Sequence, residues 1–121
     1  MATDELYSSR SVDGVMVVAF RQSHILDAIT IDRMSASLKE LIQTAIETKF
    51  LFDFEHVEYL SSNALGMLIG LQRRVVQGKG RLKVAGINEE VMEVFRITKL
   101  DTVFDIYRDA PAAIEAFRKN L

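Results

Sequence analysis

Hydroxyl and carboxylate side chains gather in the middle of this 121-residue chain, and two kinds of phosphate chemistry could use them. Ser61 and Ser62 stand directly before an apolar run of helical type, where a hydroxyl can cap the helix or accept a phosphoryl group. Asp53 ends an apolar run of strand type, and Glu55 and Glu58 follow it. An aspartate at the carboxyl end of a central strand can accept a phosphoryl group as an acyl phosphate.

Phosphorylation of Asp53 would make the chain a receiver-like phosphotransfer protein, and that chemistry needs further groups. An acidic pair after the first strand must hold Mg²⁺, and a lysine must follow a later strand. Residues 21–23 are Arg-Gln-Ser and residues 86–88 are Gly-Ile-Asn, so neither requirement is met. The receiver interpretation is therefore the less favoured one.

No other group of residues has the spacing of a metal or cofactor site. The chain has no cysteine, and its two histidines, His24 and His56, fall in different predicted connections. A metal site needs three or more ligands at a regular spacing, so both histidines are expected to face solvent. Residues 78–80, Gly-Lys-Gly, precede a predicted strand and do not open a helix, which excludes a phosphate-cradling loop. We expect no metal, no cofactor and no catalytic residue.

The composition narrows the class of protein further. Fifteen basic and seventeen acidic side chains give a net charge of −2, which removes any general attraction to nucleic acid or to an anionic membrane. No apolar run approaches the roughly 20 residues of a spanning helix, and the polar residues 1–10 do not form a signal peptide. We expect a cytoplasmic protein of one domain that contacts neither nucleic acid nor a membrane directly.

The apolar pattern alternates between strand and helix periodicity, which predicts an α/β fold. Strand-type runs cover residues 5–11, 15–20, 50–54, 81–85 and 103–107. Helix-type spacing covers residues 31–48, 61–77 and 88–98, and a fourth helix opens at residues 109–111. The run at 15–20 is continuously apolar and β-branched, so we expect a strand covered on both faces. Thr30 and Asn88 are predicted to cap two of the helices.

The most informative segment is residues 60–68, where two adjacent hydroxyls meet a strongly apolar helix. One of these serines can simply be the N-cap, which is worth about 1 kcal/mol. Gly66 and Gly70 lie one turn apart in this helix, and each costs it about 1 kcal/mol relative to alanine. These two glycines form a stripe on one face of the helix. Either close packing on the sheet or the close approach of a partner would explain it.

Residues 57–66, Val-Glu-Tyr-Leu-Ser-Ser-Asn-Ala-Leu-Gly, resemble the strand–loop–helix signature of STAS domains, especially the bacterial anti-sigma-factor antagonists. Residues 81–87 and 94–101 are also similar to this family, so the resemblance covers nearly the whole chain. It implies a single STAS-like domain over residues 1–121. Such a domain has a mixed β-sheet of about four to five strands packed with about four helices.

The resemblance also assigns roles at the start of the central helix. Aligned on the Leu-Gly pair at 65–66, Ser62 takes the position of the family's phosphorylatable serine. Ser61 then replaces the usual aspartate, Asn63 a second hydroxyl residue and Ala64 a glycine. In many members the aspartate helps to shape the site presented to the kinase, and a serine lacks its charge. Divergent members with Ser-Ser-Ala at these positions look similar to this chain.

The resemblance implies a phosphorylation-switched binding module, and not an enzyme, that regulates transcription by partner switching. The unphosphorylated protein would bind a serine-kinase anti-sigma factor, an ATP-binding protein of GHKL-like type, and so free a sigma factor or another client. Phosphorylation of Ser62 would release the kinase, and a separate phosphoserine phosphatase would reset the system. The expected partner-binding residues are Ser61, Ser62, Asn63, Gly66 and Met67.

Electrostatics supports such a switch if Ser62 caps the helix with its hydroxyl facing outward. A phosphate there adds about −1.5 to −2 charges at an end where backbone N–H groups and the helix dipole favour an anion. The fold would tolerate this charge, whereas a partner packed over it would have to desolvate it. The alternative is an interaction scaffold whose serines are never phosphorylated, as the missing aspartate permits.

Overall fold

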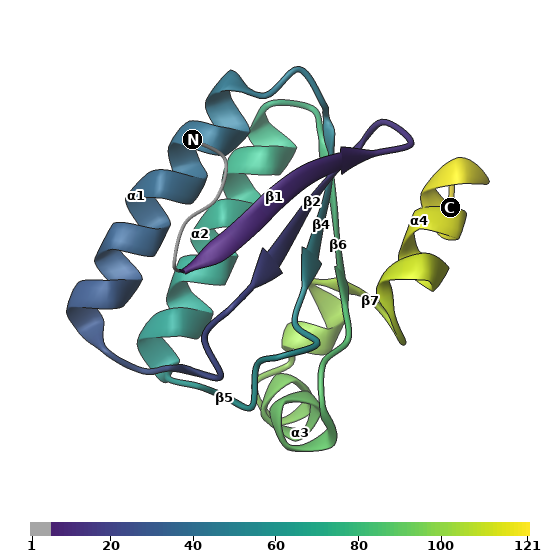
Figure 1. Ribbon diagram of the computed structural model, residues 1–121. Helices are drawn as coiled ribbons and strands as arrows, with labels where there is room; N and C mark the ends of the chain where they lie inside the picture. The colour runs from purple at the N-terminus through teal and green to yellow at the C-terminus, as the bar shows by residue number, and fades with distance from the viewer. Residues whose placement is uncertain (1–5) are drawn as a thin grey trace.

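A five-stranded mixed sheet forms the centre of the computed structural model, which describes residues 6–121 (Figure 1). In spatial order its strands are β1 (Tyr7–Val12), β2 (Val15–Phe20), β4 (Lys49–Asp53), β6 (Arg81–Ala85) and β7 (Asp105–Tyr107). β1 pairs antiparallel with β2, and all the other neighbours pair in parallel. The carboxyl ends of β2, β4, β6 and β7 therefore lie at one edge of the sheet. This arrangement confirms the expected mixed α/β fold.

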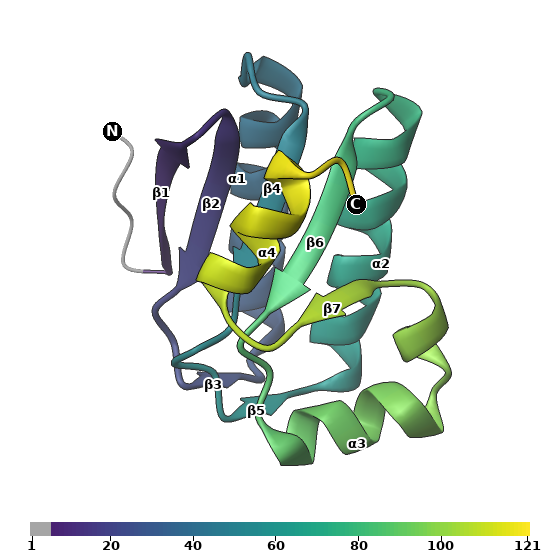
Figure 2. The ribbon, with the colours of Figure 1, turned by 90° about the vertical axis from the view of Figure 1, so that its right-hand side faces the viewer.

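Four helices cover the sheet, which is also as expected. They are α1 (Ala28–Thr44), α2 (Ser62–Gln77), α3 (Glu89–Ile97) and α4 (Ala110–Arg118). α1 and α2 lie side by side on one face, and α4 packs on the opposite face (Figures 1 and 2). α3 lies at the edge where the parallel strands end (Figure 2). Within residues 6–121, none of the helices has both the length and the apolar character needed to cross a bilayer.

β2 and β4 form the buried centre of the protein, and β2 is covered on both faces as its apolar sequence predicts. On the α1/α2 face the rings of Phe20 and Phe52 meet edge to face, with centroids 5.6 Å apart. On the opposite face Val17 and Leu51 pack with Phe117 of α4. The sheet is therefore sandwiched between two layers of apolar side chains, which leaves its carboxyl edge as the place where loops meet solvent.

Each helix begins at a residue whose side chain accepts a hydrogen bond from the backbone N–H three residues later. These N-caps are Asp27, Ser61, Asn88 and Asp109. The predicted cap at Asn88 is confirmed, with the Val91 N–H donating to its Oδ1 at 2.8 Å. The predicted cap at Thr30 is wrong, because the Thr30 N–H itself donates to Asp27 Oδ2 at 2.8 Å. A carboxylate at the start of α1 complements the helix dipole better than a hydroxyl does.

The other differences from the sequence-based expectations lie at element ends. The first helix ends at Thr44 and not at Thr48. The Thr48 carbonyl oxygen instead accepts a hydrogen bond from the Arg81 N–H at 2.8 Å, directly before β4 begins at Lys49. The last strand is shorter than predicted, since a 3₁₀ turn, η1 (Leu100–Thr102), precedes it. Glu5, the expected start of the first strand, lies outside the described residues.

A second, two-stranded sheet was not predicted. β3 (His24–Ile25) pairs in parallel with β5 (Tyr59–Leu60) below the carboxyl edge of the main sheet (Figure 2). Strands of two residues carry no readable period, so the sequence alone gives no signal for them. This small sheet matters because its β5 leads directly into α2.

The Gly-Lys-Gly turn at 78–80 ends α2, as the sequence predicts. Lys79 has a left-handed backbone with φ +63°, and Gly78 is the C-cap of the helix. A Cβ atom at Gly80 would lie 2.5 Å from the Thr48 carbonyl oxygen. The turn therefore needs a glycine at position 80 for close passage of two backbones, and not for binding phosphate.

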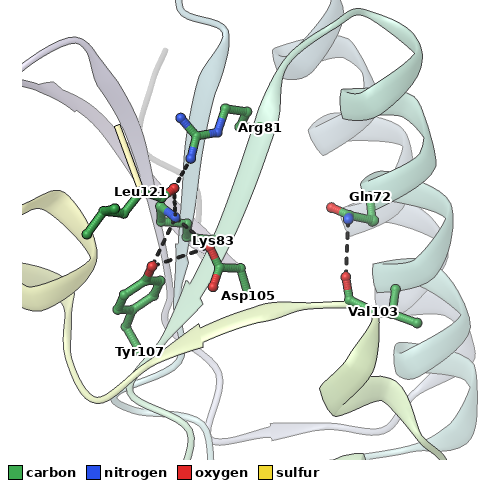
Figure 3. A network of polar contacts seen from close by, with 7 residues as sticks. All are labelled: Gln72, Arg81, Lys83, Val103, Asp105, Tyr107 and Leu121. Atoms are coloured by element: carbon green, nitrogen blue, oxygen red, sulfur yellow. Dashed lines mark hydrogen bonds and ion pairs between the residues drawn. The ribbon is translucent and has the colours of Figure 1, made fainter. Parts of the chain in front are cut away.

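A buried lysine ties α4 and the chain end to the sheet (Figure 3). The side chain of Lys83 is 1% exposed and its Nζ lies 2.5 Å from Asp105 Oδ2. The same Nζ donates to the Tyr107 hydroxyl at 3.1 Å and to the Leu121 carbonyl oxygen at 3.0 Å. It also lies 4.8 Å from the ring centroid of Phe117. Three acceptors and an aromatic face together compensate the burial of this charge.

The Lys83–Asp105 pair predicts an asymmetric response to substitution. Asp105→Ala leaves a buried cation without its carboxylate and should lower the free energy of unfolding by about 2 kcal/mol or more. Lys83→Met should cost less, because Asp105 is 52% exposed and water can solvate it. Urea unfolding of both variants measures the two costs. A larger loss in Lys83→Met than in Asp105→Ala would contradict this account.

Candidate functional site

The carboxyl edge of the sheet gathers the candidate residues. The parallel strands end there, α1 and α2 begin there, and β3, β5 and α3 form its rim (Figures 1 and 2). Polar groups and helix starts converge at such an edge in any open sheet of parallel strands. The paired serines at the start of α2 belong to this edge.

Ser61, and not Ser62, is the N-cap of α2, a choice that the sequence left open. The Ala64 N–H donates to Ser61 Oγ at 3.1 Å, and the Leu65 N–H donates to the Ser61 carbonyl oxygen at 3.1 Å. The Ser61 N–H in turn donates to the Ile25 carbonyl oxygen of β3 at 3.0 Å. These bonds hold Ser61 in extended backbone, with φ −82° and ψ 169°, which is the conformation that a capping residue adopts.

Ser62 is the first residue of α2 and is exposed. Among residues 6–121 its hydroxyl has no hydrogen-bond partner. The backbone N–H groups of Ser62 and Asn63 also lack an acceptor within the described chain, as is usual in the first turn of a helix. An anion attached to the Ser62 oxygen would therefore meet two available backbone donors and the positive end of the helix dipole.

The remaining expected partner-binding residues do not all reach the surface. Asn63 and Gly66 are exposed, but Met67 is 8% exposed and packs in the core. An edge of Met67 and the Asn63 side chain line a hollow of about 200 Å³ against α1, where Asp32 and Ser35 face them. Met67 thus packs α2 against the core and offers a partner little accessible surface.

The glycine stripe on α2 has an informative geometry. A Cβ atom placed at Gly66 or at Gly70 would meet no other atom within 4 Å. Close packing on the sheet therefore does not require either glycine, although each weakens the helix by about 1 kcal/mol relative to alanine. Packing within the described chain therefore does not account for the two glycines.

Several apolar side chains are exposed on the β3–α1 connection, α1, β5 and α3. They are Leu26 (50% exposed), Ile29 (72%), Tyr59 (45%), Val94 (38%) and Ile97 (72%). Tyr59 and Val94 line one hollow together, and a contiguous exposed apolar patch can mark an interaction site. Sequence reasoning missed this pair, because β5 and α3 are distant in the chain.

The acidic residues that follow β4 do not form one group. Asp53 and Glu55 line a hollow of about 490 Å³ with Arg108 at the start of α4, whereas Glu58 faces a different hollow beside α3. Burial raises the pKa of the Asp53 carboxyl above its ordinary value, the hydrogen bond from the Glu55 N–H opposes this shift, and the Glu55 charge adds to it. Lys83 bonds to Asp105, so it does not serve Asp53 as a receiver lysine would.

The two histidines are exposed, as expected, but His24 lies in β3 and not in a loop. Its ring packs against Tyr59 of β5, with centroids 5.0 Å apart, and its Nδ1 lies 2.8 Å from Ser23 Oγ. His56 is in the turn before β5. Among residues 6–121 no three acidic or histidine side chains lie close enough together to hold a metal ion.

Comparison with known proteins identifies similar chains. A family model described as the STAS domain matches residues 8–113. BtrV of Bordetella bronchiseptica, named as a candidate anti-sigma factor antagonist, is 22% identical over 110 residues, which cover 91% of this chain and 92% of BtrV.

Solved structures show the same fold at low sequence identity. The crystal structure of a candidate anti-sigma factor antagonist from Thermotoga maritima has a TM-score of 0.83 and 20% identity, covering 93% of this chain and 94% of that one. SpoIIAA in its unphosphorylated form has a TM-score of 0.70 and 18% identity, covering 93% and 97% of the two chains. The phosphorylated form of the Bacillus protein has a TM-score of 0.70 and 16% identity, covering 92% and 98%.

The capping geometry predicts that the two serines differ in their effect on stability. Ser61→Ala removes the acceptor for the Ala64 N–H and should cost about 1 kcal/mol. Ser62→Ala removes an exposed hydroxyl that bonds to nothing in the described chain and should change stability by less than about 0.5 kcal/mol. Chemical denaturation of both variants tests this. Equal losses, or a larger loss in Ser62→Ala, would contradict the assignment of Ser61 as the cap.

The raised pKa of Asp53 predicts a stability difference that depends on pH. Between its unfolded and folded pKa values the folded protein binds more protons, so the contribution of Asp53 is present in acid and is lost as pH rises through the folded pKa. Asp53→Asn keeps an acceptor for the Glu55 N–H without the charge. Its stability relative to wild type should therefore rise between pH 3 and pH 7 in urea titrations.

Asp27→Asn is the matched control for this experiment, with the opposite sign. The hydrogen bond from the Thr30 N–H lowers the pKa of the Asp27 carboxyl, so the contribution of Asp27 is present above its unfolded pKa and is lost as pH falls. Relative to wild type, this variant should become less stable from pH 3 to pH 7. The same trend in both variants would refute the pKa assignments.

Proposed function

This chain belongs to the STAS domain family, and from that membership we propose that it is an anti-sigma factor antagonist controlled by phosphorylation of Ser62. In this proposal the unphosphorylated protein binds a serine-kinase anti-sigma factor over the start of α2 and frees a sigma factor or another client. The kinase then phosphorylates Ser62, the complex dissociates, and a phosphoserine phosphatase restores the hydroxyl. The chain is a regulatory binding protein and a phosphorylation substrate that acts in the cytoplasm, where its partner finds ATP.

One observation carries the proposal, namely that the Ser62 hydroxyl is exposed at the first residue of α2 and is bonded to no described residue. In the transfer step the Ser62 oxygen attacks the γ-phosphorus of the partner's ATP. ADP leaves, and the hydroxyl proton passes to a base of the kinase. The phosphatase later adds water to the phosphoserine and releases inorganic phosphate. The antagonist itself contributes only a reachable nucleophile.

The fold should accept the phosphate without rearrangement. Phosphoserine adds about −1.5 to −2 charges and three acceptor oxygens. At Ser62 these oxygens would lie near the unbonded N–H groups of Ser62 and Asn63, at the positive end of the α2 dipole. The start of α1 carries the carboxylate of Asp27 as its own cap and offers the phosphate no competing place.

A partner, in contrast, should not accept the phosphate. The exposed apolar side chains around α2, Ile29 and Tyr59 among them, favour a partner that seals this edge from water. Sealing a doubly charged group without a compensating cation costs several kcal/mol. A loss of about 3 kcal/mol already weakens a complex more than a hundredfold. One covalent change can therefore switch binding while the fold stays intact.

Ser61 retains part of what the family's aspartate supplies at this position. Aspartate and serine are both strong N-caps, and Ser61 performs this role through the Ala64 N–H. The substitution removes a negative charge beside the acceptor, and the helix start keeps its geometry. The absence of the aspartate is therefore compatible with a site that a kinase can use. The open space above Gly66 further favours a partner whose backbone comes close to α2.

Intact-mass analysis tests the proposal directly. After incubation with a serine-kinase anti-sigma factor and ATP, wild type and Ser61→Ala should each gain one phosphoryl group, and Ser62→Ala should gain none. The modification should survive hydroxylamine, which cleaves acyl phosphates, so that a phosphate on Asp53 is distinguished. Phosphorylated protein and Ser62→Asp should bind the kinase at least a hundredfold more weakly than wild type in calorimetry.

Two results would contradict the phosphorylation switch. A stable complex in which wild type gains no phosphate, and which Ser62→Asp forms as tightly, would support the scaffold alternative. A phosphate that hydroxylamine removes and that Asp53→Asn abolishes would support the receiver-like alternative.

A further inference from the structure

A second recognition element lies beside the serine site, in an apolar hollow between β5 and α3. Its volume is about 160 Å³, and we call it the Tyr59–Val94 pocket. The residues that line it are Glu58, Tyr59, Leu60, Leu65, Glu90, Val91 and Val94. None of them was among the residues expected to bind a partner.

The size and lining of the pocket suit a single apolar side chain. An apolar protein cavity of about 150 Å³ admits a benzene molecule, so a phenyl or isobutyl group fits in this volume. Tyr59 is 45% exposed and Val94 is 38% exposed, while Leu65 and Val91 are buried and form the floor. Filling the pocket would remove apolar surface from water on both sides of the contact.

The charges at the pocket indicate what should flank that side chain. Glu58 and Glu90 are exposed lining residues, and neither forms an ion pair within residues 6–121. Arg96, the cation on the same helix, bonds to Glu89 at 3.0 Å and to Glu93 at 3.1 Å and is thereby engaged elsewhere. The rim of the pocket therefore carries two carboxylates that have no ion-pair partner in the described chain, and they complement a basic group on the occupant.

The position of the pocket connects it to the serine site. Leu60 and Leu65, which line it, lie two residues before and three residues after Ser62 in the chain. A partner that covers the start of α2 therefore also reaches the pocket. Since Ser62 does not line the pocket, its occupant can anchor the complex independently of the hydroxyl.

We propose that the Tyr59–Val94 pocket receives one protruding apolar side chain of the partner protein, flanked on that partner by lysine or arginine. The identity of the partner as an anti-sigma factor rests on the proposed function. The chemistry of the occupant rests on the apolar floor and the acidic rim alone. The pocket supplies affinity and register, and Ser62 supplies control.

A peptide experiment tests the pocket without any kinase. The probe is a pentapeptide with a central phenylalanine and two lysines on each side. Matched controls replace the phenylalanine by alanine or the lysines by glutamates. In ¹⁵N–¹H spectra of the full chain, the probe should shift the amide signals of Tyr59, Leu65 and Val94 with a Kd in the millimolar range or tighter. Both controls should bind at least tenfold more weakly.

Charge and shape variants then connect the pocket to the partner. Val94→Lys places a cation at the pocket mouth and should weaken the binding of both the probe and the kinase at least tenfold. The matched control is Val76→Lys, which changes a valine that is 55% exposed at the far end of α2 and should leave both affinities unchanged. Replacing Glu58 and Glu90 together by glutamine should weaken the lysine probe and reduce the salt dependence of kinase binding. Thermal unfolding verifies that each variant is folded.

The outcomes separate this proposal from the phosphorylation switch. If the probe binds wild type and Ser62→Ala equally and no kinase phosphorylates wild type, the pocket is supported and the switch is refuted. Equal binding of the lysine and glutamate peptides, or a kinase affinity unchanged by Val94→Lys, would refute the pocket whatever happens at Ser62. A dimer in size-exclusion chromatography that Val94→Lys dissociates would also overturn it, because a second copy of the chain would then be the occupant.

Discussion

Three hydrogen bonds of Ser61 hold the candidate site together. Its N–H donates to Ile25 of β3, its carbonyl oxygen accepts from Leu65, and its hydroxyl accepts from Ala64. One residue therefore connects the small sheet below the carboxyl edge to the first turn of α2. Because backbone and side chain are both engaged, the next residue, Ser62, begins the helix in one orientation with its hydroxyl outward. Ser61 thus holds the start of the helix, and Ser62 presents its hydroxyl to solvent.

This division accounts for how the site can differ from the usual family pattern and still present a hydroxyl. Capping requires a short side chain with an acceptor oxygen, which serine and aspartate both provide. A negative charge beside Ser62, the proposed phosphoryl acceptor, would affect the approach of a partner. It is not needed to cap the first turn of α2. The surroundings are built for contact: Gly66 leaves open space above α2, and Tyr59 and Val94 stay exposed at its side. Met67, buried beneath, keeps the helix seated on α1.

The sequence predicted the five main strands and four helices because long apolar runs and turn residues have strong local signals. It failed at the start of α1, where Asp27 caps in place of Thr30, and it did not decide between Ser61 and Ser62 at the start of α2. All four residues are of types that cap helices well, and only the position of the donating N–H decides among them. The small sheet and the pocket were out of reach for a different reason. They depend on tertiary packing that brings Tyr59 beside α3, which no local period encodes.

The face of the sheet under α4 is separate from the edge that carries the serines. Lys83 lies in that interface, with its amine enclosed by Asp105, Tyr107 and the ring of Phe117. An acylating reagent in solution cannot reach an amine that is 1% exposed, although it reacts freely with the surface lysines. Acylation at this position therefore requires α4 to leave the sheet. The rate at which Lys83 is acylated therefore measures how often α4 detaches from the sheet. This rate is independent of binding or phosphorylation at the carboxyl edge.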